Sequence, residues 1–118
     1  MQRLKILFGI IFLLMVVAAF FYQQFLVNAQ LERGKQVFLN YCQGCHGVDG
    51  NGKGPAAAAI SGAKPRDFTK EDFKYGSSSE ELFKTISQGV PGTVMPPWSS
   101  LTAAERQDVI TYIKALKK

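Results

Sequence analysis

The sequence predicts an all-α protein in which one apolar helix precedes a small helical domain. Residues 6–27 hold no charged side chain and are mostly apolar, as expected of a single long helix. Ser78 with Glu81, and Thr102 with Glu105, match the pattern that opens helices, and apolar residues at three- and four-residue spacing follow each pair. Between them, three prolines in residues 91–97 exclude a helix and a central strand.

The segment Ile6–Val27 has the length of a membrane span. Its 22 residues would form a helix of about 33 Å, which is enough to cross the hydrocarbon core of a bilayer. Arg3 and Lys5 precede it, and basic residues in this position stay in the cytoplasm. We therefore expect residues 1–29 to anchor the chain in a bacterial inner membrane, with residues 30–118 forming one domain in the periplasm.

A cleaved signal peptide is the alternative interpretation of this segment. Val27-Asn28-Ala29 resembles a signal-peptidase site, and cleavage near Ala29 would release a soluble periplasmic protein beginning at Gln30. The uncharged run is longer than the apolar region of a signal peptide, which is about 7–15 residues. This length favours a retained anchor.

Three helices are expected in the domain. The first, Leu31–Tyr41, places apolar residues on one face. Gly34 within it is either a tolerated surface glycine or a point where another helix crosses too closely for a side chain. The second helix begins at Ser77 or Ser78 and ends at Gly89, and the third runs from Thr102 to about Leu116.

The sequence Cys42-Gln43-Gly44-Cys45-His46 has the spacing of a c-type haem attachment site. Two thiols at this spacing can form thioethers with the haem, and the next residue can bind its iron through the imidazole. A thioredoxin-like dithiol, half of a zinc site and a disulfide are the alternatives. The chain contains no further Cys or His to complete a zinc site. We therefore predict one covalently bound haem c, with His46 as an iron ligand.

Two loops supply the remaining candidates for the haem site. Residues 47–55 are rich in Gly and Pro, and we expect the carbonyl of Pro55 to orient the ring of His46 unless Pro55 is only a turn residue. Met95 lies in the proline-rich loop and is the only methionine of the domain, which makes it the predicted second iron ligand. Arg66 would meet a haem propionate or remain a solvated surface residue. Trp98 would cover the haem edge, meet a propionate or belong to the core.

The domain resembles class I cytochromes c over Leu31–Leu116. The resemblance implies an all-α cytochrome c fold of about three to five helices, with haem in a crevice between a His side and a Met side. It also implies that the first and last helices cross at Gly34, with Tyr112 or Phe38 packed over it. The anchor and the long Phe-rich middle loop depart from the family pattern. The residues that carry the resemblance are Cys42, Cys45, His46, Gly52–Pro55, Met95–Trp98 and Tyr112–Leu116.

One-electron transfer, and not enzymatic catalysis, is the function that these features predict. An imidazole and a thioether on the iron favour the ferrous state and leave no open site for a substrate. The expected partners are redox proteins, a quinol-oxidising complex and a terminal oxidase or reductase, and the protein would be a tethered carrier or a haem subunit. A net charge of +5 without a basic stripe excludes nucleic acid as a partner. The alternative is a haem-based sensor or a peroxidase-like enzyme in which Met95 leaves the iron.

Overall fold

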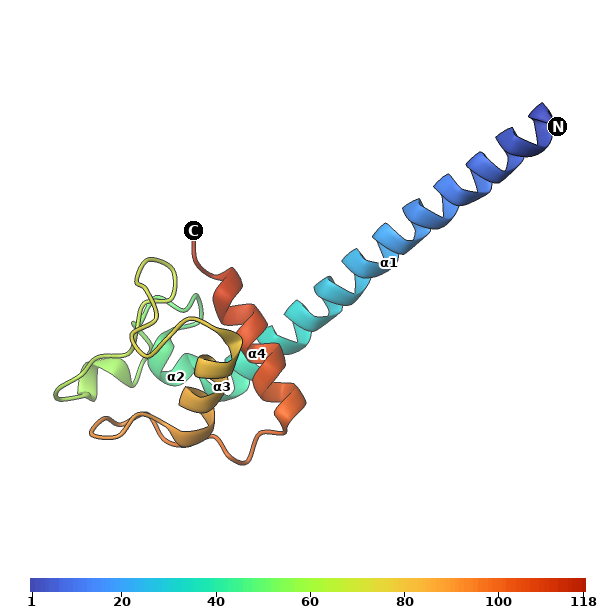
Figure 1. Ribbon diagram of the computed structural model, residues 1–118. Coiled ribbons are helices and arrows are strands. Elements are labelled where there is room, and N and C mark those ends of the chain that lie inside the picture. Colours follow the sequence, from blue (N-terminus) through green and yellow to red (C-terminus); the bar gives the residue numbers. More distant parts are fainter.

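The computed structural model describes residues 1–118 as helices joined by loops, without any strand (Figure 1). The prediction of an all-α fold is therefore confirmed. In chain order the elements are α1 (Gln2–Tyr41), α2 (Gln43–His46), the 3-10 turn η1 (Ala57–Ala59), α3 (Ser79–Gln88) and α4 (Ala103–Ala115).

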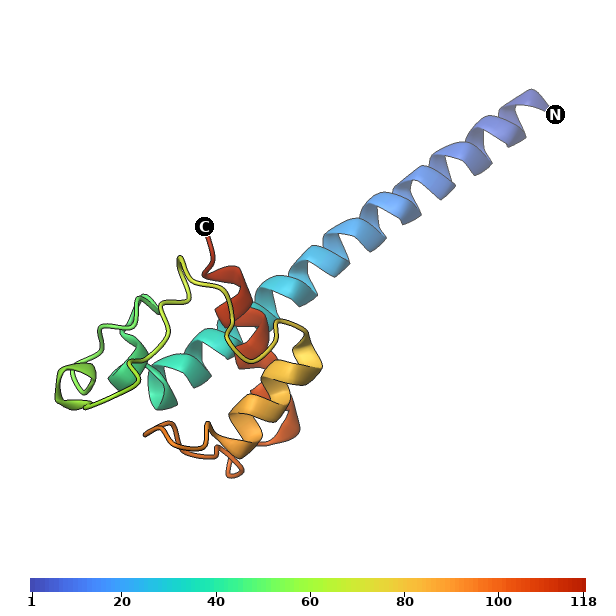
Figure 2. The ribbon, with the colours of Figure 1, turned by 60° about the vertical axis from the view of Figure 1, so that its left-hand side comes forward.

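The helix α1 is much longer than the width of the domain formed by the other elements. Residues 1–28 are exposed along their whole length and project from the domain, as both views show (Figures 1 and 2). The molecule consequently measures 75 × 24 × 23 Å. All the other elements gather at the C-terminal end of α1, where α4 lies across it.

The structure corrects the expectation of a separate domain helix that begins at Leu31. The apolar segment and the domain helix form one helix of 40 residues. Gln23 and Gln24 interrupt the apolar pattern, but they are good helix formers and do not break the backbone hydrogen bonding. Neither Gly nor Pro occurs between Gly9 and Gly34, so nothing in this stretch ends the helix.

Both predicted helix starts are confirmed as capping boxes. In α3 the backbone N–H of Glu81 donates to Ser78 Oγ at 3.1 Å, and the backbone N–H of Ser78 donates to Glu81 Oε2 at 3.0 Å. In α4 the corresponding distances between Thr102 and Glu105 are 3.2 and 2.8 Å. These reciprocal bonds satisfy backbone donors that the first turn leaves unpaired.

Gly34 marks the crossing of α1 and α4, as the resemblance to class I cytochromes c implied. A Cβ atom at this position would lie 2.0 Å from the carbonyl oxygen of Asp108 and 2.9 Å from the Cβ of Tyr112. Any side chain here would therefore push the two helices apart. Beside the crossing, Arg33 Nε donates to Asp108 Oδ2 at 2.8 Å, which pairs a carboxylate that the crossing largely buries.

The core lies where α1, α3 and α4 meet. Phe38 of α1 and Ile110 of α4 are completely buried, and the ring of Phe38 packs against Tyr112 with centroids 5.3 Å apart. Leu82 and Ile86 bring α3 into the same cluster. These two residues also line the cavity described below, so the packing of the core fixes one wall of the site.

We predict that Gly34→Ala destabilises the domain by about 1–3 kcal/mol, the usual cost of forcing atoms into a closed contact. Denaturant unfolding of the detergent-solubilised holoprotein, followed by helical circular dichroism, measures the change. Gly9→Ala is the matched control, because Gly9 lies in the same helix and has no atom within 4 Å of an added Cβ. Equal unfolding midpoints for the two variants would contradict the close crossing.

Candidate functional site

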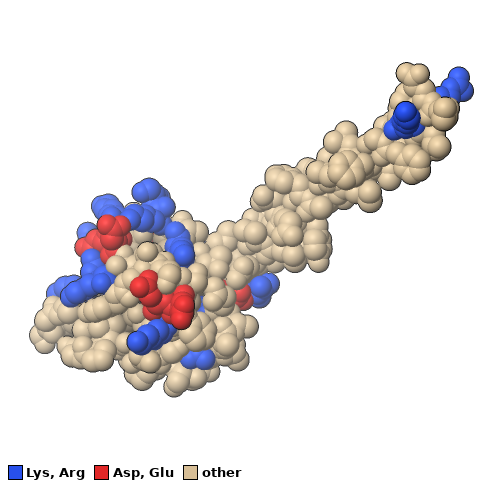
Figure 3. Space-filling model, in the orientation of Figure 1, with Lys and Arg blue, Asp and Glu red and all other residues tan.

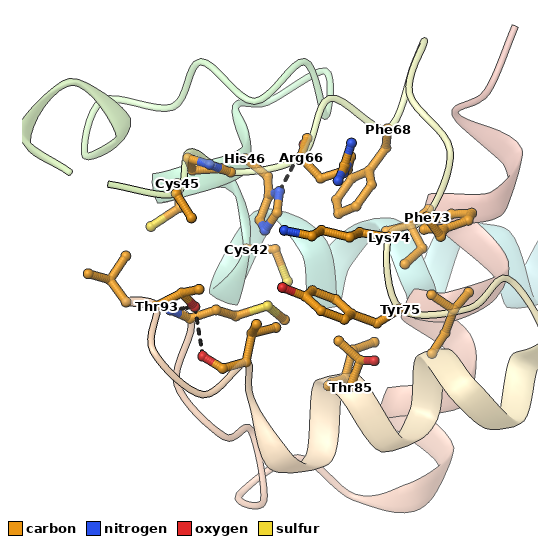
Figure 4. Close-up of a pocket in the computed structure, with 18 of the residues that line it drawn as sticks. Cys42, Cys45, His46, Arg66, Phe68, Phe73, Lys74, Tyr75, Thr85 and Thr93 are labelled. Atoms are coloured by element: carbon orange, nitrogen blue, oxygen red, sulfur yellow. Dashed lines mark hydrogen bonds between the residues drawn. The ribbon is translucent and has the colours of Figure 1, made fainter. Parts of the chain in front are cut away.

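One cavity of about 420 Å³ separates α2 and its following loops from α3 and the proline-rich loop (Figure 4). Fifteen of its 25 lining residues are hydrophobic, which is typical of a pocket for a large cofactor. Four residues singled out from the sequence line this one cavity: Cys42, Cys45, His46 and Met95.

The two cysteines lie at the end of α1 and in α2. Cys42 is the C-cap residue of α1, and Cys45 follows three residues later. Burial, with a smaller contribution from Cys45, raises the pKa of the Cys42 thiol to about 12. A thioredoxin-like pair needs a thiol whose pKa is lowered, so the environment of Cys42 argues against that chemistry. No group of three or more His, Cys, Asp or Glu side chains comes together, as a zinc site would require.

The ring of His46 is held on two sides. Its Nδ1 lies 3.2 Å from the backbone carbonyl oxygen of Arg66, and the ring of Phe68 stacks on it with centroids 4.5 Å apart. Burial lowers the pKa of His46, and the hydrogen bond to Arg66 opposes that shift. The environment therefore favours a neutral imidazole, and when Nδ1–H donates to Arg66 the Nε2 lone pair is left for a metal.

This geometry corrects the prediction for Pro55. The carbonyl that accepts from His46 belongs to Arg66, whereas Pro55 is exposed and does not line the cavity. The reason lies in the path of the chain, because residues 65–68 return across α2 and bring the Arg66 backbone to the imidazole. Gly52 marks this return, since a Cβ atom there would lie 2.7 Å from the carbonyl oxygen of Pro65.

The glycine-rich loop fastens the short helix α2. All four carbonyls of α2 accept hydrogen bonds from backbone N–H groups beyond it, at distances between 2.8 and 3.0 Å. Gly54 comes so close that an added Cβ would lie 2.4 Å from the carbonyl oxygen of Gly44. A helix of four residues leaves its carbonyls without partners of its own, and this loop supplies them. The donors to Gln43, Gly44, Cys45 and His46 are respectively Gly47, Ala56, Gly54 and Gly52.

Met95 comes from the loop that follows α3, on the other side of the cavity. Its backbone N–H lies 3.2 Å from Thr93 Oγ1, and its carbonyl accepts from the Val90 N–H at 3.2 Å. The backbone N–H of Trp98 donates to the Ile86 carbonyl at 2.9 Å and so ties the end of the loop to α3. In Figure 4, Thr93 of this loop lies across the cavity from His46. The two predicted iron ligands thus come from opposite walls.

Arg66 and Trp98 both line the cavity. The guanidinium of Arg66 is paired with Glu71, with Nη1 and Oε2 2.7 Å apart, so it is not simply a solvated surface group. Trp98 is half-buried and its ring meets Tyr41 edge to face, with centroids 5.6 Å apart. Trp98 therefore closes the cavity on the side of α1 and also packs against the core.

Three further cavity residues were not assigned to the site from the sequence. Phe68 stacks on His46, and Lys74 and Tyr75 project into the cavity from the segment before α3 (Figure 4). Their only sequence signal was the aromatic content of this segment, which is equally typical of a core. The donor set as a whole fits a haem: two thiols, one imidazole and one thioether around a largely apolar space.

Comparison with known proteins identifies the family. Residues 31–117 match the protein-family model described as Cytochrome c. The chain belongs to the cytochrome c family. This cytochrome c therefore carries covalently bound haem c, and the solved structures similar to it include other c-type cytochromes.

Several relatives of this cytochrome c are oxidase subunits. The cbb3-type cytochrome c oxidase subunit FixP of Bradyrhizobium diazoefficiens is 36% identical over 85 residues, which cover 71% of this chain and 27% of that protein. The chain spans 27–31% of the length of the four such subunits that it matches. Cytochrome c of Tetrahymena pyriformis is 28% identical over 95 residues, which cover 70% of this chain and 85% of that protein.

Two solved structures agree with the fold. A chain of the Kuenenia stuttgartiensis reducing HAO-like protein complex superimposes with a TM-score of 0.68 and 35% identity, covering 73% of this chain and 42% of that one. The KustC0563 c-type cytochrome superimposes with a TM-score of 0.57 and 30% identity, covering 72% of this chain and 98% of that one. The similarity extends over the helical domain and confirms the predicted cytochrome c fold.

We predict that Gly54→Ala lowers the melting temperature of the holoprotein by about 5–15 °C, because the added methyl group would displace the loop from α2. Thermal melting followed by visible absorption of the haem measures this effect. Gly44→Ala is the control within the attachment motif, since an added Cβ there meets no atom within 4 Å. An unchanged melting temperature for Gly54→Ala would show that the loop does not hold α2.

Proposed function

We propose that this cytochrome c transfers single electrons through a haem that is bound to Cys42 and Cys45 by thioethers and ligated by His46 and Met95. The observation that carries the proposal is that one cavity is lined by both cysteines, the only histidine of the chain and the only methionine of the domain. When bound, the haem supplies an iron that changes its oxidation state by one electron.

On the proximal side, the protein holds His46 in one orientation. The Arg66 carbonyl and the stacked ring of Phe68 restrict rotation of the imidazole. A hydrogen bond to Nδ1 of this kind also strengthens the imidazole as a ligand. Arg66 provides this contact through its backbone, and its side chain, paired with Glu71, also lines the cavity. The guanidinium has further N–H donors, and we place these beside a haem propionate.

On the distal side, Met95 supplies a soft thioether that favours the ferrous state and raises the redox potential. The hydrogen bond from the Met95 N–H to Thr93 within the loop, and the bond from the Trp98 backbone to α3, fix the depth at which the sulfur is presented. Prolines in the loop lower the conformational entropy that folding must overcome. Trp98 shields the neighbouring wall from water. With His46 and Met95 both holding the iron, the protein would leave no site for a substrate, which would favour electron transfer over catalysis.

The exposed length of α1 supports a membrane anchor formed by residues 1–29. Its most apolar 18-residue window has a mean hydropathy of 2.8 and is not buried at all within the molecule. Lys and Arg side chains mark the far end of α1 and the domain, while residues 6–31 between them carry no charge (Figure 3). We infer a helix that crosses a bacterial inner membrane, with Arg3 and Lys5 in the cytoplasm and residues 30–118 in the periplasm.

Several of the relatives are subunits of cbb3-type oxidases, and this similarity suggests a terminal oxidase or reductase as the electron acceptor. We propose a quinol-oxidising complex as the donor. The protein would act between them as a tethered carrier or as a haem subunit of one of the two complexes. Contact through a small and transient interface would suit repeated exchange of single electrons.

We predict that Met95→Ala keeps the haem attached but lowers its potential by on the order of 0.1 V, since axial ligands set haem potentials over a wide range. The ferrous variant should also bind carbon monoxide, which the natural protein should exclude. Redox titration and absorption spectra of the purified protein test both effects. Met15→Ala, which changes the only methionine within the apolar segment, is the control.

A Met95→Ala variant with the spectrum and potential of the natural protein would contradict ligation by Met95. Ready binding of carbon monoxide by the natural ferrous protein would instead favour the alternative function, a sensor or a peroxidase-like enzyme with a labile methionine.

We predict that the mature protein stays in the membrane fraction when membranes are washed with alkaline carbonate, and that it retains its N-terminal segment. The physical reason is the burial of about 22 apolar residues in the bilayer. N-terminal sequencing of the detergent-extracted protein checks this expectation. A sequence beginning at Gln30 would show that the segment is a cleaved signal peptide.

A further inference from the structure

The membrane segment and the domain of this cytochrome c are joined without a flexible linker. The apolar run ends at Val27, and from Ala29 onward α1 is already partly buried. A surface groove lies between Asn28 and Leu31 of α1 and the C-terminal end of α4, and residues of both helices line it. A Gly- or Ser-rich linker would let the domain swing away from its anchor, whereas a continuous helix acts as a stiff spacer.

The domain also cannot pivot about this helix. Gly34 presses against the backbone of Asp108, and Arg33 pairs with the carboxylate of the same residue. Phe38 is completely buried one turn further along. These contacts fix one face of the last two turns of α1 to the domain, so the domain and the helix move as one body.

The helix therefore sets the height of the haem pocket above the bilayer. Cys42 lines the pocket and lies 15 residues beyond Val27, a distance of about 22 Å along a helix axis. Tilting of the helix over the usual range of about 0–40° would change this height by only about 5 Å. The height stays within this range because the helix that spans the membrane continues to the residue before Cys42.

We propose that α1 is a rigid spacer that presents the pocket to a redox protein bound to the same membrane, whose docking face lies at the matching height. This inference rests on the proposed function. A fixed height lowers the entropy lost on docking to a partner that is itself fixed in the bilayer. It offers no such gain toward a protein that diffuses freely in the periplasm and can approach at any height.

Two insertions of equal length between Val27 and Asn28 test the proposal in the full-length protein. One adds seven residues of the helical sequence Glu-Ala-Ala-Ala-Lys-Ala-Ala, which raises the domain by about 10 Å. These residues form about two full turns, so the orientation of the domain about the helix axis stays nearly unchanged. The other adds seven Gly and Ser residues, which lengthen the connection but let the domain return to its natural height. The variants replace the natural chain in its own membranes.

Stopped-flow absorbance then measures reduction of the haem by duroquinol and its re-oxidation by oxygen, which both proceed through other proteins of the membrane. We expect the helical insertion to slow these reactions about tenfold or more, because a stiff connection of the wrong length prevents docking. The Gly/Ser insertion should remain within a few-fold of the natural rate. Equal rates for the natural chain and the helical variant would overturn the proposal, and so would an equal loss in both variants.

Reduction by ascorbate with a soluble mediator distinguishes failure of the spacer proposal from failure of the proposed function. The mediator reaches the haem without a protein partner, so all variants should be reduced at the natural rate. A natural protein that ascorbate cannot reduce would refute one-electron transfer itself. Ascorbate reduction that is normal in every variant, combined with a selective loss of membrane-linked exchange in the helical variant, supports the spacer.

Discussion

The crossing of α1 and α4 at Gly34 is the contact on which the rest of the structure depends. Two backbones meet there with no side chain between them, and the Arg33–Asp108 ion pair closes the edge of the contact. From the crossing, a series of aromatic contacts leads to the site. Phe38 packs against Phe68 with centroids 6.4 Å apart, and Phe68 stacks on His46. A displacement of the two helices would therefore move the imidazole.

The two walls of the cavity are built differently. On the α2 side, backbone hydrogen bonds from a glycine-rich loop hold a helix too short to be stable alone. On the Met95 side, prolines and the hydroxyl of Thr93 stiffen a loop that has no regular structure. Both walls rest on the same core, since α1 ends directly before Cys42 and α3 leads directly into the Met95 loop.

Features with local causes could be predicted from the sequence. The two capping boxes and the attachment motif are each marked by particular residue types at fixed spacing. The crossing at Gly34 was implied only by the resemblance to class I cytochromes c, because a glycine alone fits an exposed position equally well. The continuity of α1 was missed because Gln23 and Gln24 interrupt the hydropathy pattern, whereas helix continuity depends on the absence of Gly and Pro. The acceptor for His46 could not be found, because every residue has a carbonyl and only the path of the chain brings that of Arg66 to the ring.

The capping boxes at the start of α3 and α4 make the domain sensitive to acid. Hydrogen bonds from the backbone N–H and hydroxyl of Ser78 lower the pKa of Glu81, and the equivalent groups of Thr102 lower that of Glu105. A lowered pKa in the folded state means that the stabilisation is complete above the ordinary glutamate pKa and is lost as the pH falls through the lowered values. Acidification would thus loosen both helices together, while the thioether bonds keep the cofactor on the chain for refolding when neutrality returns.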